Sequence, residues 1–256
     1  MQTPSEYRAI LAGKVHAVQH RIVESASRAG RDAKDVTIVA VTKYALASDP
    51  LIPALLELGL VRLGENRIPM LLDKRAAFGP DIGGESRLTP VPQWHFIGSL
   101  QRNKVRKILP FVTMIHSIDS ERLLDAVDRI AAEEDIKSER SALGLPQRVP
   151  VLLEVNIGGE ATKHGFDPAI LETLMPQLLR YTNVEISGLM GMARLDADER
   201  ETRREFCMLN TLSQTVRKYA TETHPCSELS MGMSGDFQCA VECGATLVRL
   251  GSLLYP

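Results

Sequence analysis

Cysteine is scarce in this sequence, and its spacing excludes the commonest cysteine-based sites. The four cysteines are Cys207, Cys226, Cys239 and Cys243, and no two of them form a C-x-x-C pair. Cys239 and Cys243 lie four residues apart on an expected helix, but the second ligand pair of a zinc site is missing. We therefore expect no metal site of this type and four reduced, buried thiols.

Long apolar runs and an excess of one charge are also absent. No run approaches the roughly 20 apolar residues that a helix needs to span a bilayer, and the opening stretch MQTPSEYRAI is too polar for a secretory signal. The 30 Lys and Arg against 32 Asp and Glu give a net charge of −2, which does not fit a broad nucleic-acid-binding surface. We expect a cytoplasmic protein that contacts neither membrane nor nucleic acid.

What the sequence does contain is a regular alternation of strand-like and helical segments. The apolar, strand-like segments cover residues 36–43, 60–66, 93–99, 113–119, 150–156, 184–192, 228–234 and 247–252. The helical segments cover residues 4–29, 50–58, 67–78, 101–109, 121–134, 168–181, 199–222 and 236–243. Residues 79–92, rich in Gly and Pro, and the polar residues 137–148 are expected to be loops.

This alternation predicts an α/β fold with a parallel sheet. Eight such units in about 250 residues fit a closed (β/α)₈ TIM barrel, formed by one domain over residues 1–256. The helix over 4–29 precedes the first strand and is expected to fill the gap between strands eight and one. An open, doubly wound sheet is the alternative, because periodicity alone does not establish closure.

Polar residues gather where the predicted strands end. In TIM-barrel enzymes the chemistry lies at the carboxyl ends of the strands. The residues at or just after these ends are Lys43, Glu65, Asn66, Ser99, Asn156, Ser234, Arg249, Gly251 and Ser252. Closure of the barrel would place all of them on one rim, so together they form a candidate site.

Strands seven and eight carry the features of a phosphate site. Strand seven runs into Ser234-Gly235-Asp236, which is typical of a helix N-cap followed by a glycine, and strand eight ends in Gly251-Ser252. TIM barrels often bind phosphate with the loops after these two strands and a helix amino terminus. Either these residues bind a phosphate group, or Ser234 only caps a helix.

Lys43 and Arg249 narrow the kind of ligand. Lysine amines form Schiff bases with carbonyl compounds, so a ligand with both an aldehyde and a phosphate, such as pyridoxal 5′-phosphate (PLP), fits this rim. A sugar phosphate, with Lys43 as a counter-charge, is the alternative. Arg249 would donate to an unprotonated pyridine nitrogen, which makes a weaker electron sink than a carboxylate partner does; alternatively, Arg249 forms an ion pair with a glutamate.

The chain closely resembles the PLP homeostasis proteins, which are single-barrel relatives of alanine racemase. The resemblance runs from residue 39 to residue 252 and rests on the stretches VAVTKY, LGEN, WHFIGSLQRNKVRKI, HSIDS, VLLEVNIGGEATKHGF, ISGLMGM and LSMGMSGDFQCAVECGATLVRLGS. It implies a (β/α)₈ barrel of the alanine racemase N-terminal type, which is PLP fold type III.

The resemblance also implies roles for single residues. Lys43 would carry PLP as a Schiff base, Arg249 would face the pyridine nitrogen, and Asn66 would lie near the ring. The residues that would hold the phosphate are Ser234, Gly251 and Ser252, with Ser230 as a further contributor.

The resemblance implies a function in PLP (vitamin B6) homeostasis without established catalysis. Family members are thought to buffer PLP or to deliver it to PLP-dependent apoenzymes, and we expect this chain to act as a monomer. A PLP-dependent amino-acid racemase or lyase is the alternative. A racemase needs a second base, for which His95, His116 and His164 are candidates, although His95 lies within an apolar strand, as a hydrogen-bonded core residue does.

Overall fold

Eight parallel strands form a closed barrel in which each strand pairs with the next one in the sequence and the last pairs with the first. The computed structural model of the chain describes residues 4–79, 90–159 and 164–255. The strands are β1 (Thr37–Val41), β2 (Arg62–Glu65), β3 (Gln93–Phe96), β4 (Val112–Ile118), β5 (Val149–Val155), β6 (Val184–Gly191), β7 (Glu228–Ser230) and β8 (Leu247–Leu250). The predicted closed barrel is confirmed, and the open, doubly wound alternative is wrong.

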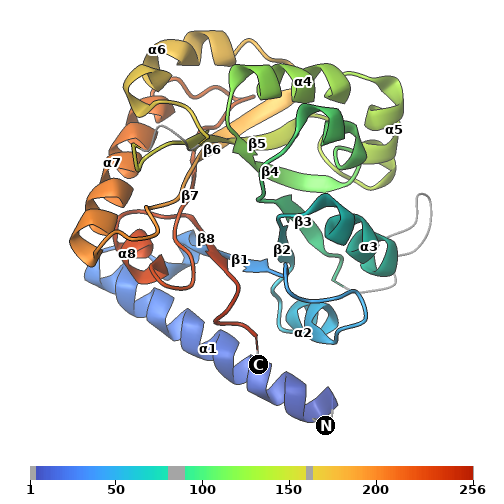
Figure 1. Ribbon diagram of the computed structural model, residues 1–256, viewed down its shortest axis with the longest axis vertical. Coiled ribbons are helices and arrows are strands. Elements are labelled where there is room, and N and C mark those ends of the chain that lie inside the picture. The colour runs from blue at the N-terminus through green and yellow to red at the C-terminus, as the bar shows by residue number, and fades with distance from the viewer. Residues whose placement is uncertain (1–3, 80–89, 160–163, 256) are drawn as a thin grey trace.

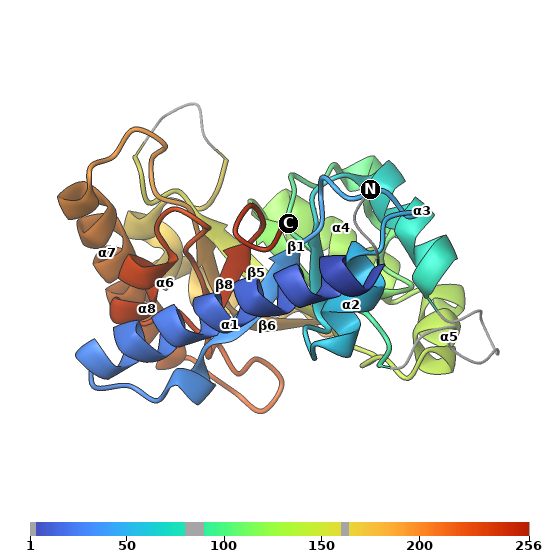
Figure 2. The same cartoon turned by 90° about the horizontal axis from the view of Figure 1, so that it is seen from below.

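Helices cover the outside of this barrel (Figure 1). They are α1 (Pro4–Arg28), α2 (Leu51–Glu57), α3 (Ile68–Phe78), α4 (Glu121–Ala131), α5 (Glu134–Ala142), α6 (Pro168–Leu178), α7 (Glu199–Arg217) and α8 (Phe237–Glu242). α1 runs across the outside of β8 and β1 and packs against α8 and α2 (Figure 2). It buries Leu11, Val15, Val18 and Ile22, which recur at helical spacing. α1 therefore fills the gap between the last and first strands, as predicted.

One expected loop is half helical. Residues 137–148 were predicted to be a loop because they are polar, but α5 extends to Ala142. Its Ile136 and Arg140 are buried, and Arg140 Nη1 donates to the carbonyl of Leu109 at 2.6 Å. The helix is held by one apolar and one cationic side chain, a combination that the average polarity of the segment conceals.

Two further expected segments differ in detail or lie outside the described residues. The helix expected over 101–109 is a short 3₁₀ helix, η2 (Arg102–Lys107), and another, η1 (Ala33–Asp35), precedes β1. The loop expected over 79–92 includes residues 80–89, which lie outside the described residues. Neither difference affects the pairing of β1 with β8.

The interior of the barrel has an apolar layer and, nearer the carboxyl ends of the strands, a polar one. The apolar layer consists of Val39, Leu152, Met190 and Leu247, with Met114 packed against them. Glu154, His116 and Arg249 each lie two residues further along the same strands as Leu152, Met114 and Leu247. Because residues i and i+2 of a strand share a face, these three polar side chains belong to the interior as well.

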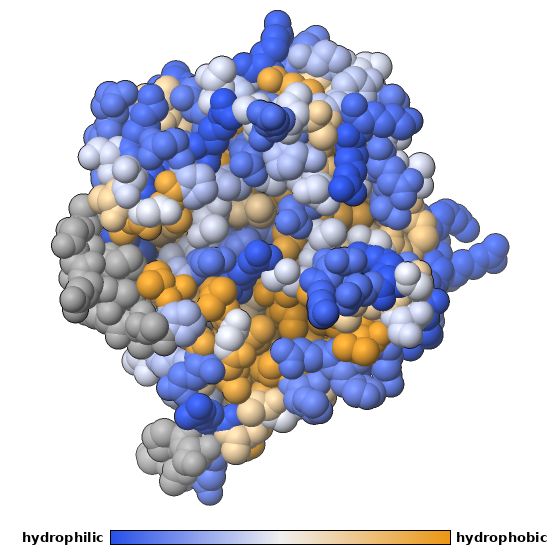
Figure 3. All heavy atoms as spheres, turned by 180° about the vertical axis from the view of Figure 1, so that it is seen from behind, coloured by the Kyte–Doolittle hydropathy of each residue, from blue (hydrophilic) through white to orange (hydrophobic). Residues whose placement is uncertain are grey.

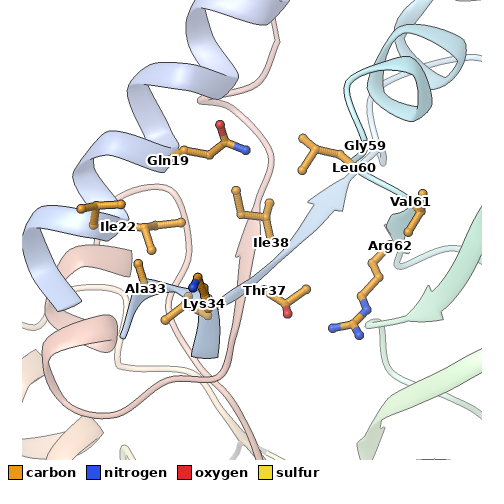
Figure 4. A pocket seen from close by; sticks show the side chains of 12 residues that line it. Gln19, Ile22, Ala33, Lys34, Thr37, Ile38, Gly59, Leu60, Val61 and Arg62 are labelled. Carbon is orange, nitrogen blue, oxygen red and sulfur yellow. The ribbon is translucent and has the colours of Figure 1, made fainter. Parts of the chain in front are cut away.

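The amino-terminal end of the barrel carries a separate groove. It has a volume of about 390 Å³ and lies between α1, the start of β1 and the turn that leads into β2 (Figure 4). Ile22, Ile38 and Leu60 line it together with Lys34 and Arg62.

Seen from behind the view of Figure 1, the surface is mostly hydrophilic, with apolar side chains gathered near its centre and lower part (Figure 3). Within the described ranges, no helix is long and apolar enough to cross a membrane.

The cysteines are free thiols, and three of them are buried as expected. Cys226, Cys239 and Cys243 are buried, whereas Cys207 is exposed. The expectation of four buried thiols is wrong at Cys207, which is exposed although its sulfur lies beside that of Cys243. Over residues 4–79, 90–159 and 164–255, no group of His, Cys, Asp and Glu is suited to hold a metal ion.

A buried ion pair holds the end of β1 against α3. The Lys74 ammonium donates to Glu65 Oε1 and, at 2.7 Å, to the carbonyl of Thr42. The Thr42 hydroxyl donates to the same carboxylate oxygen at 2.5 Å. Lys74 and Glu65 are both 0% exposed. Glu65, which the sequence placed in the candidate site, is therefore part of the support behind Lys43.

Removal of one partner of this pair should destabilise the fold strongly. Lys74→Met leaves a buried carboxylate without its cation, and such changes cost about 3–5 kcal/mol. Denaturant unfolding should show this loss for Lys74→Met and a smaller loss for the double variant Glu65→Leu/Lys74→Met. The matched control is Arg8→Ala, which breaks the exposed Arg8–Glu57 pair and should cost less than about 1 kcal/mol. Equal losses in Lys74→Met and Arg8→Ala would contradict the role of the buried pair.

Candidate cofactor site

Lys43 lies on the loop after β1, at the carboxyl rim of the barrel. β1 ends at Val41, and the backbone N–H of Thr42 still donates to Gly64 at 3.0 Å. Lys43 is exposed, and its Nζ lies 4.9 Å from the centre of the Tyr44 ring, which is itself 70% exposed. The lysine is thus held at the rim by a short strand and stays open to solvent.

Tyr255 braces the same loop, although nothing in the sequence singled it out. Its hydroxyl accepts from the Tyr44 backbone N–H at 3.1 Å and donates to the Val41 carbonyl at 3.4 Å. The Tyr44 and Tyr255 rings meet edge to face, with 6.0 Å between their centres. The segment after β8 therefore contacts the loop that presents Lys43.

Arg249 is buried inside the polar layer, and serine and backbone groups hold it. Its Nη1 donates to Ser230 Oγ at 2.6 Å, and its Nη2 donates to the Gly191 carbonyl at 3.1 Å. Burial lowers the pKa of Arg249 to about 10, while the charges of Asp236 and Glu154 oppose this shift. Among the described residues, the carboxylates whose charges act on Arg249 are Asp236 and Glu154, and the expected alternative of an ion pair with a glutamate stays a prediction.

Two histidines continue the hydrogen-bonded chain behind Arg249. His116 Nδ1 lies 2.9 Å from Ser230 Oγ, and its Nε2 lies 2.8 Å from His95 Nδ1. Burial, followed by the charge of Arg62, lowers the pKa of His95 to about 3, and burial beside His95 lowers the pKa of His116 well below its usual range. Both imidazoles are therefore neutral, hydrogen-bonded core residues, as expected for His95.

The loops after β7 and β8 contact each other directly. Ser234 Oγ accepts from the Gly251 backbone N–H at 3.2 Å. The expectation that Ser234 caps a helix is wrong, because Asp236 is the N-cap of α8 and its side chain accepts from the Met233 N–H at 2.5 Å. Ser234 instead fixes the distance between the two loops that were expected to hold a phosphate.

Glycine is required at one point of the β7 loop. Gly232 has φ = +89°, and a Cβ there would lie 2.5 Å from Ala240 Cβ. Only glycine allows this backbone to pack so closely on α8. By contrast, a Cβ on Gly235 would meet no atom within 4 Å, so space is open over the loop.

Asn66 and Ser252 follow the ends of β2 and β8 and therefore lie at the same rim. Asn66 is half-buried after β2, and its backbone crosses Gly98 so closely that a Cβ on Gly98 would lie 2.2 Å from the Asn66 carbonyl oxygen. Asn66 Oδ1 is buried and has no hydrogen-bond partner within the described ranges. Ser252 is exposed one residue beyond Gly251. The structure thus pairs Ser230 with Arg249 and Ser234 with Gly251, and it leaves Lys43, Asn66 and Ser252 around them.

Glu154 is a further residue of the interior that sequence reasoning missed. It lines a cavity of about 280 Å³ together with Ile97, Ser99 and Met192. Burial, followed by the charge of Asp119, raises the pKa of Glu154 to about 7, and the charges of Arg249 and His164 oppose this shift. The period-two alternation of β5, which places Glu154 two residues after the inward Leu152, is the sequence signal that could have identified it.

His164, the third candidate base, lies outside this chain of groups. It is exposed, and its Nδ1 lies 3.5 Å from Asp119 Oδ2. Like Ser99, it borders the cavity that Glu154 lines. The site therefore combines an accessible lysine, a buried guanidinium, two connected loops and a carboxyl group that titrates near neutral pH.

Comparison with known proteins identifies the family to which the chain belongs. Residues 14–256 match the family model described as alanine racemase, N-terminal domain. The pyridoxal phosphate homeostasis protein of Aquifex aeolicus is 34% identical over 242 residues, which are 94% of this chain and 96% of that protein.

Solved structures agree with this match. The structure of PipY from Synechococcus elongatus with PLP bound has a TM-score of 0.71 and 32% identity, and the match covers 92% of this chain and 100% of that chain. Alanine racemase from Corynebacterium glutamicum, at 14% identity and a TM-score of 0.61 over 94% of this chain and 60% of that one, shares the fold. The chain therefore belongs to the pyridoxal phosphate homeostasis protein family, within the larger family of the alanine racemase N-terminal domain.

Proposed function

We propose that this chain binds PLP at the carboxyl rim of its barrel, as a Schiff base on Lys43, and serves in PLP homeostasis without turnover of a substrate. The observation that carries the proposal is the pairing of β1 with β8, because it brings Lys43 to the rim that also holds Arg249 and Gly251. PLP supplies a carbonyl group that reacts reversibly with amines and an electron-withdrawing ring. The PLP-bound structure of the relative PipY supports this choice of ligand.

The two connected loops suit the phosphate group. The backbone N–H groups of Gly235 and Ser252 have no acceptor among the described residues. They flank the Ser234–Gly251 hydrogen bond, and the space over Gly235 is open. Unpaired backbone N–H groups next to serine hydroxyls are favourable partners for phosphate oxygens. Ser234, Gly251 and Ser252 are therefore the proposed phosphate residues.

Arg249 and Asn66 suit the ring. A guanidinium can only donate hydrogen bonds, so Arg249 would hold the pyridine nitrogen in its unprotonated form. Ser230, which faces Arg249 rather than the open loops, is a positioning residue in this proposal. The buried Asn66 Oδ1, for which the described residues supply no hydrogen-bond donor, would find a donor when the site is filled.

The same features favour storage of the cofactor over catalysis. Lys43 and Tyr44 are exposed, so bound PLP can exchange with solution or with an acceptor protein. An unprotonated pyridine nitrogen stabilises carbanions poorly, which suppresses racemase and lyase chemistry. We propose that the chain acts as a cytoplasmic monomer and that PLP-dependent apoenzymes receive the cofactor.

Loss of the Lys43 amine should abolish covalent PLP binding. Protein reconstituted with PLP and reduced with borohydride should carry a pyridoxyl group on Lys43, identified by peptide mass spectrometry. Lys43→Ala should lose both this adduct and the visible absorbance of bound PLP, because the proposed Schiff base forms on this amine. The matched control is Lys34→Ala, which removes an exposed lysine at the opposite end of the barrel and should keep both signals.

Two other outcomes would overturn the proposal. A wild-type protein that gains no pyridoxyl adduct would favour a sugar-phosphate site. Formation of a D-amino acid or a keto acid from a panel of L-amino acids, above the rate with free PLP and dependent on Lys43, would favour the racemase or lyase alternative.

Ser230 should influence the electronic state of the bound ligand through Arg249. Ser230→Ala removes the acceptor of the 2.6 Å bond from Arg249 Nη1, and the loss of such a charged hydrogen bond costs about 1.5–3 kcal/mol. We expect PLP affinity to fall roughly tenfold or more and the absorbance maximum of bound PLP to shift. Ser187→Ala, at another buried strand serine, should change neither; an unshifted spectrum in Ser230→Ala would rule out this positioning role.

Glu154 should make stability depend on pH. Its pKa in the fold is about 7, above the value of about 4.3 in an unfolded chain, so its stabilising contribution is present at low pH and is lost as pH rises to 7. As the pH rises from 5 to 8, wild type loses this contribution and Glu154→Gln does not. The free energy of unfolding of Glu154→Gln minus that of wild type should therefore increase by about 1–2 kcal/mol over this range. Glu222→Gln, at an exposed position, is the control. A pH-independent difference between Glu154→Gln and wild type would contradict the raised pKa.

A further inference from the structure

Three of the four cysteines gather where α7 packs against α8. Cys207 lies on α7, Cys239 lies on α8, and Cys243 is the C-cap of α8. The two helices are neighbours in both views of the fold (Figures 1 and 2). Cys207 Sγ lies 2.7 Å from Cys243 Sγ, which is closer than two sulfur atoms approach without a bond or a hydrogen bond between them.

The pair has the accessibility that a redox reaction needs. Cys207 is exposed, so a solvent oxidant can reach it, whereas Cys243 is 5% exposed and lies directly behind it. The Cys243 thiol also donates weakly to the Arg203 carbonyl at 3.6 Å. An exposed thiol next to a second, sheltered thiol is the arrangement of an attacked and a resolving cysteine.

The neighbouring groups shift the pKa values of the two thiols on α8 in opposite directions. The adjacent Cys243 thiol, helped by the charge of Arg203, lowers the pKa of the Cys239 thiol, and burial opposes this shift. The hydrogen bonds with Cys239 and the burial of the thiol raise the pKa of Cys243. Cys243 therefore keeps its proton in the reduced protein and can pass it to a leaving hydroxide when it attacks.

Helix geometry selects which two cysteines can join. Cys239 and Cys243 are four residues apart, and residues with this spacing have Cβ atoms about 5–6 Å apart. A disulfide needs Cβ atoms about 3.5–4.5 Å apart, so a bond along the helix would distort it. The pair across the two helices, Cys207 and Cys243, already has its sulfur atoms in contact.

We propose that Cys207 and Cys243 form a reversible redox site that a peroxide oxidises to an intramolecular disulfide. The Cys207 sulfur attacks the hydroxyl oxygen of the peroxide and keeps it as a sulfenic acid. The O–O bond breaks, and the other oxygen takes the Cys207 thiol proton and leaves as water or an alcohol. Cys243 then attacks the Cys207 sulfur, the S–S bond forms, and the hydroxide leaves with the Cys243 proton as water. Two thiols are oxidised, and one peroxide is reduced.

This site lies one short helix away from the loop of Ser234. α8 begins three residues after Ser234, and Gly232 in that loop packs against Ala240 of α8. A disulfide at Cys243 would tie α8 to α7 covalently and would restrain the helix on which this loop rests. The redox site does not depend on the proposed PLP function, because its chemistry uses only the thiols.

Mass spectrometry of the full-length protein tests the proposal. Fully reduced protein is treated with a small excess of hydrogen peroxide, denatured, alkylated and digested. We expect a peptide that links residues 207 and 243 within one chain, alkylation of Cys226 and Cys239 only, and reversal by dithiothreitol. Cys207→Ser should abolish the link and leave the other three cysteines alkylated.

Matched variants make the result decisive. Cys226→Ser removes a buried cysteine outside the cluster and should keep the link, and Cys239→Ser should also keep it. Four alkylated cysteines after peroxide treatment, or a Cys207 that gains oxygen without forming a link, would overturn the proposal. So would a link between two chains or a link that involves Cys239.

Discussion

The pairing of β1 with β8 is the constraint on which the rest of the structure depends. Val39 pairs with Arg249 and Ala40 with Leu250, so residues separated by about two hundred positions share one rim. This register places the loop of Lys43 beside the loop of Gly251, and a Cβ on Gly251 would lie 3.5 Å from Val41 Cβ. Without closure, the lysine and the buried arginine would end at opposite edges of an open sheet.

Closure also creates the interior in which Arg249 can be held. Four apolar side chains fill the lower layer, and above them the guanidinium is bonded to Ser230 and Gly191, with His116 and His95 behind. Behind the rim, the Glu65–Lys74 pair fixes the carbonyl of Thr42. Inside the barrel, Ser230 and the two neutral imidazoles thus position Arg249. Outside it, the Glu65–Lys74 ion pair positions the loop that presents Lys43.

The barrel fold and several candidate site residues could be predicted from the sequence, because the alternation of β and α segments and the polar residues at strand ends are local patterns. Lys43, Arg249 and the Ser234 and Gly251 loops were found in this way. Only the N-cap alternative for Ser234 was wrong, since its hydroxyl accepts from a backbone N–H seventeen residues away. Glu65 and Glu154 are both strand carboxylates, and only the direction of each side chain, outward to Lys74 or inward to the cavity, tells their roles apart. Tyr255 and the Cys207–Cys243 contact depend on tertiary packing that no local pattern reports.

We propose that Arg249 donates to an unprotonated pyridine nitrogen while Lys43 holds the cofactor. Nitrogen-15 NMR of the full-length protein loaded with PLP labelled at the ring nitrogen tests this most directly. We expect the chemical shift of an unprotonated, hydrogen-bonded pyridine nitrogen, unchanged across neutral pH. A pyridinium shift, or a ring nitrogen that titrates as it does in free PLP, would contradict it.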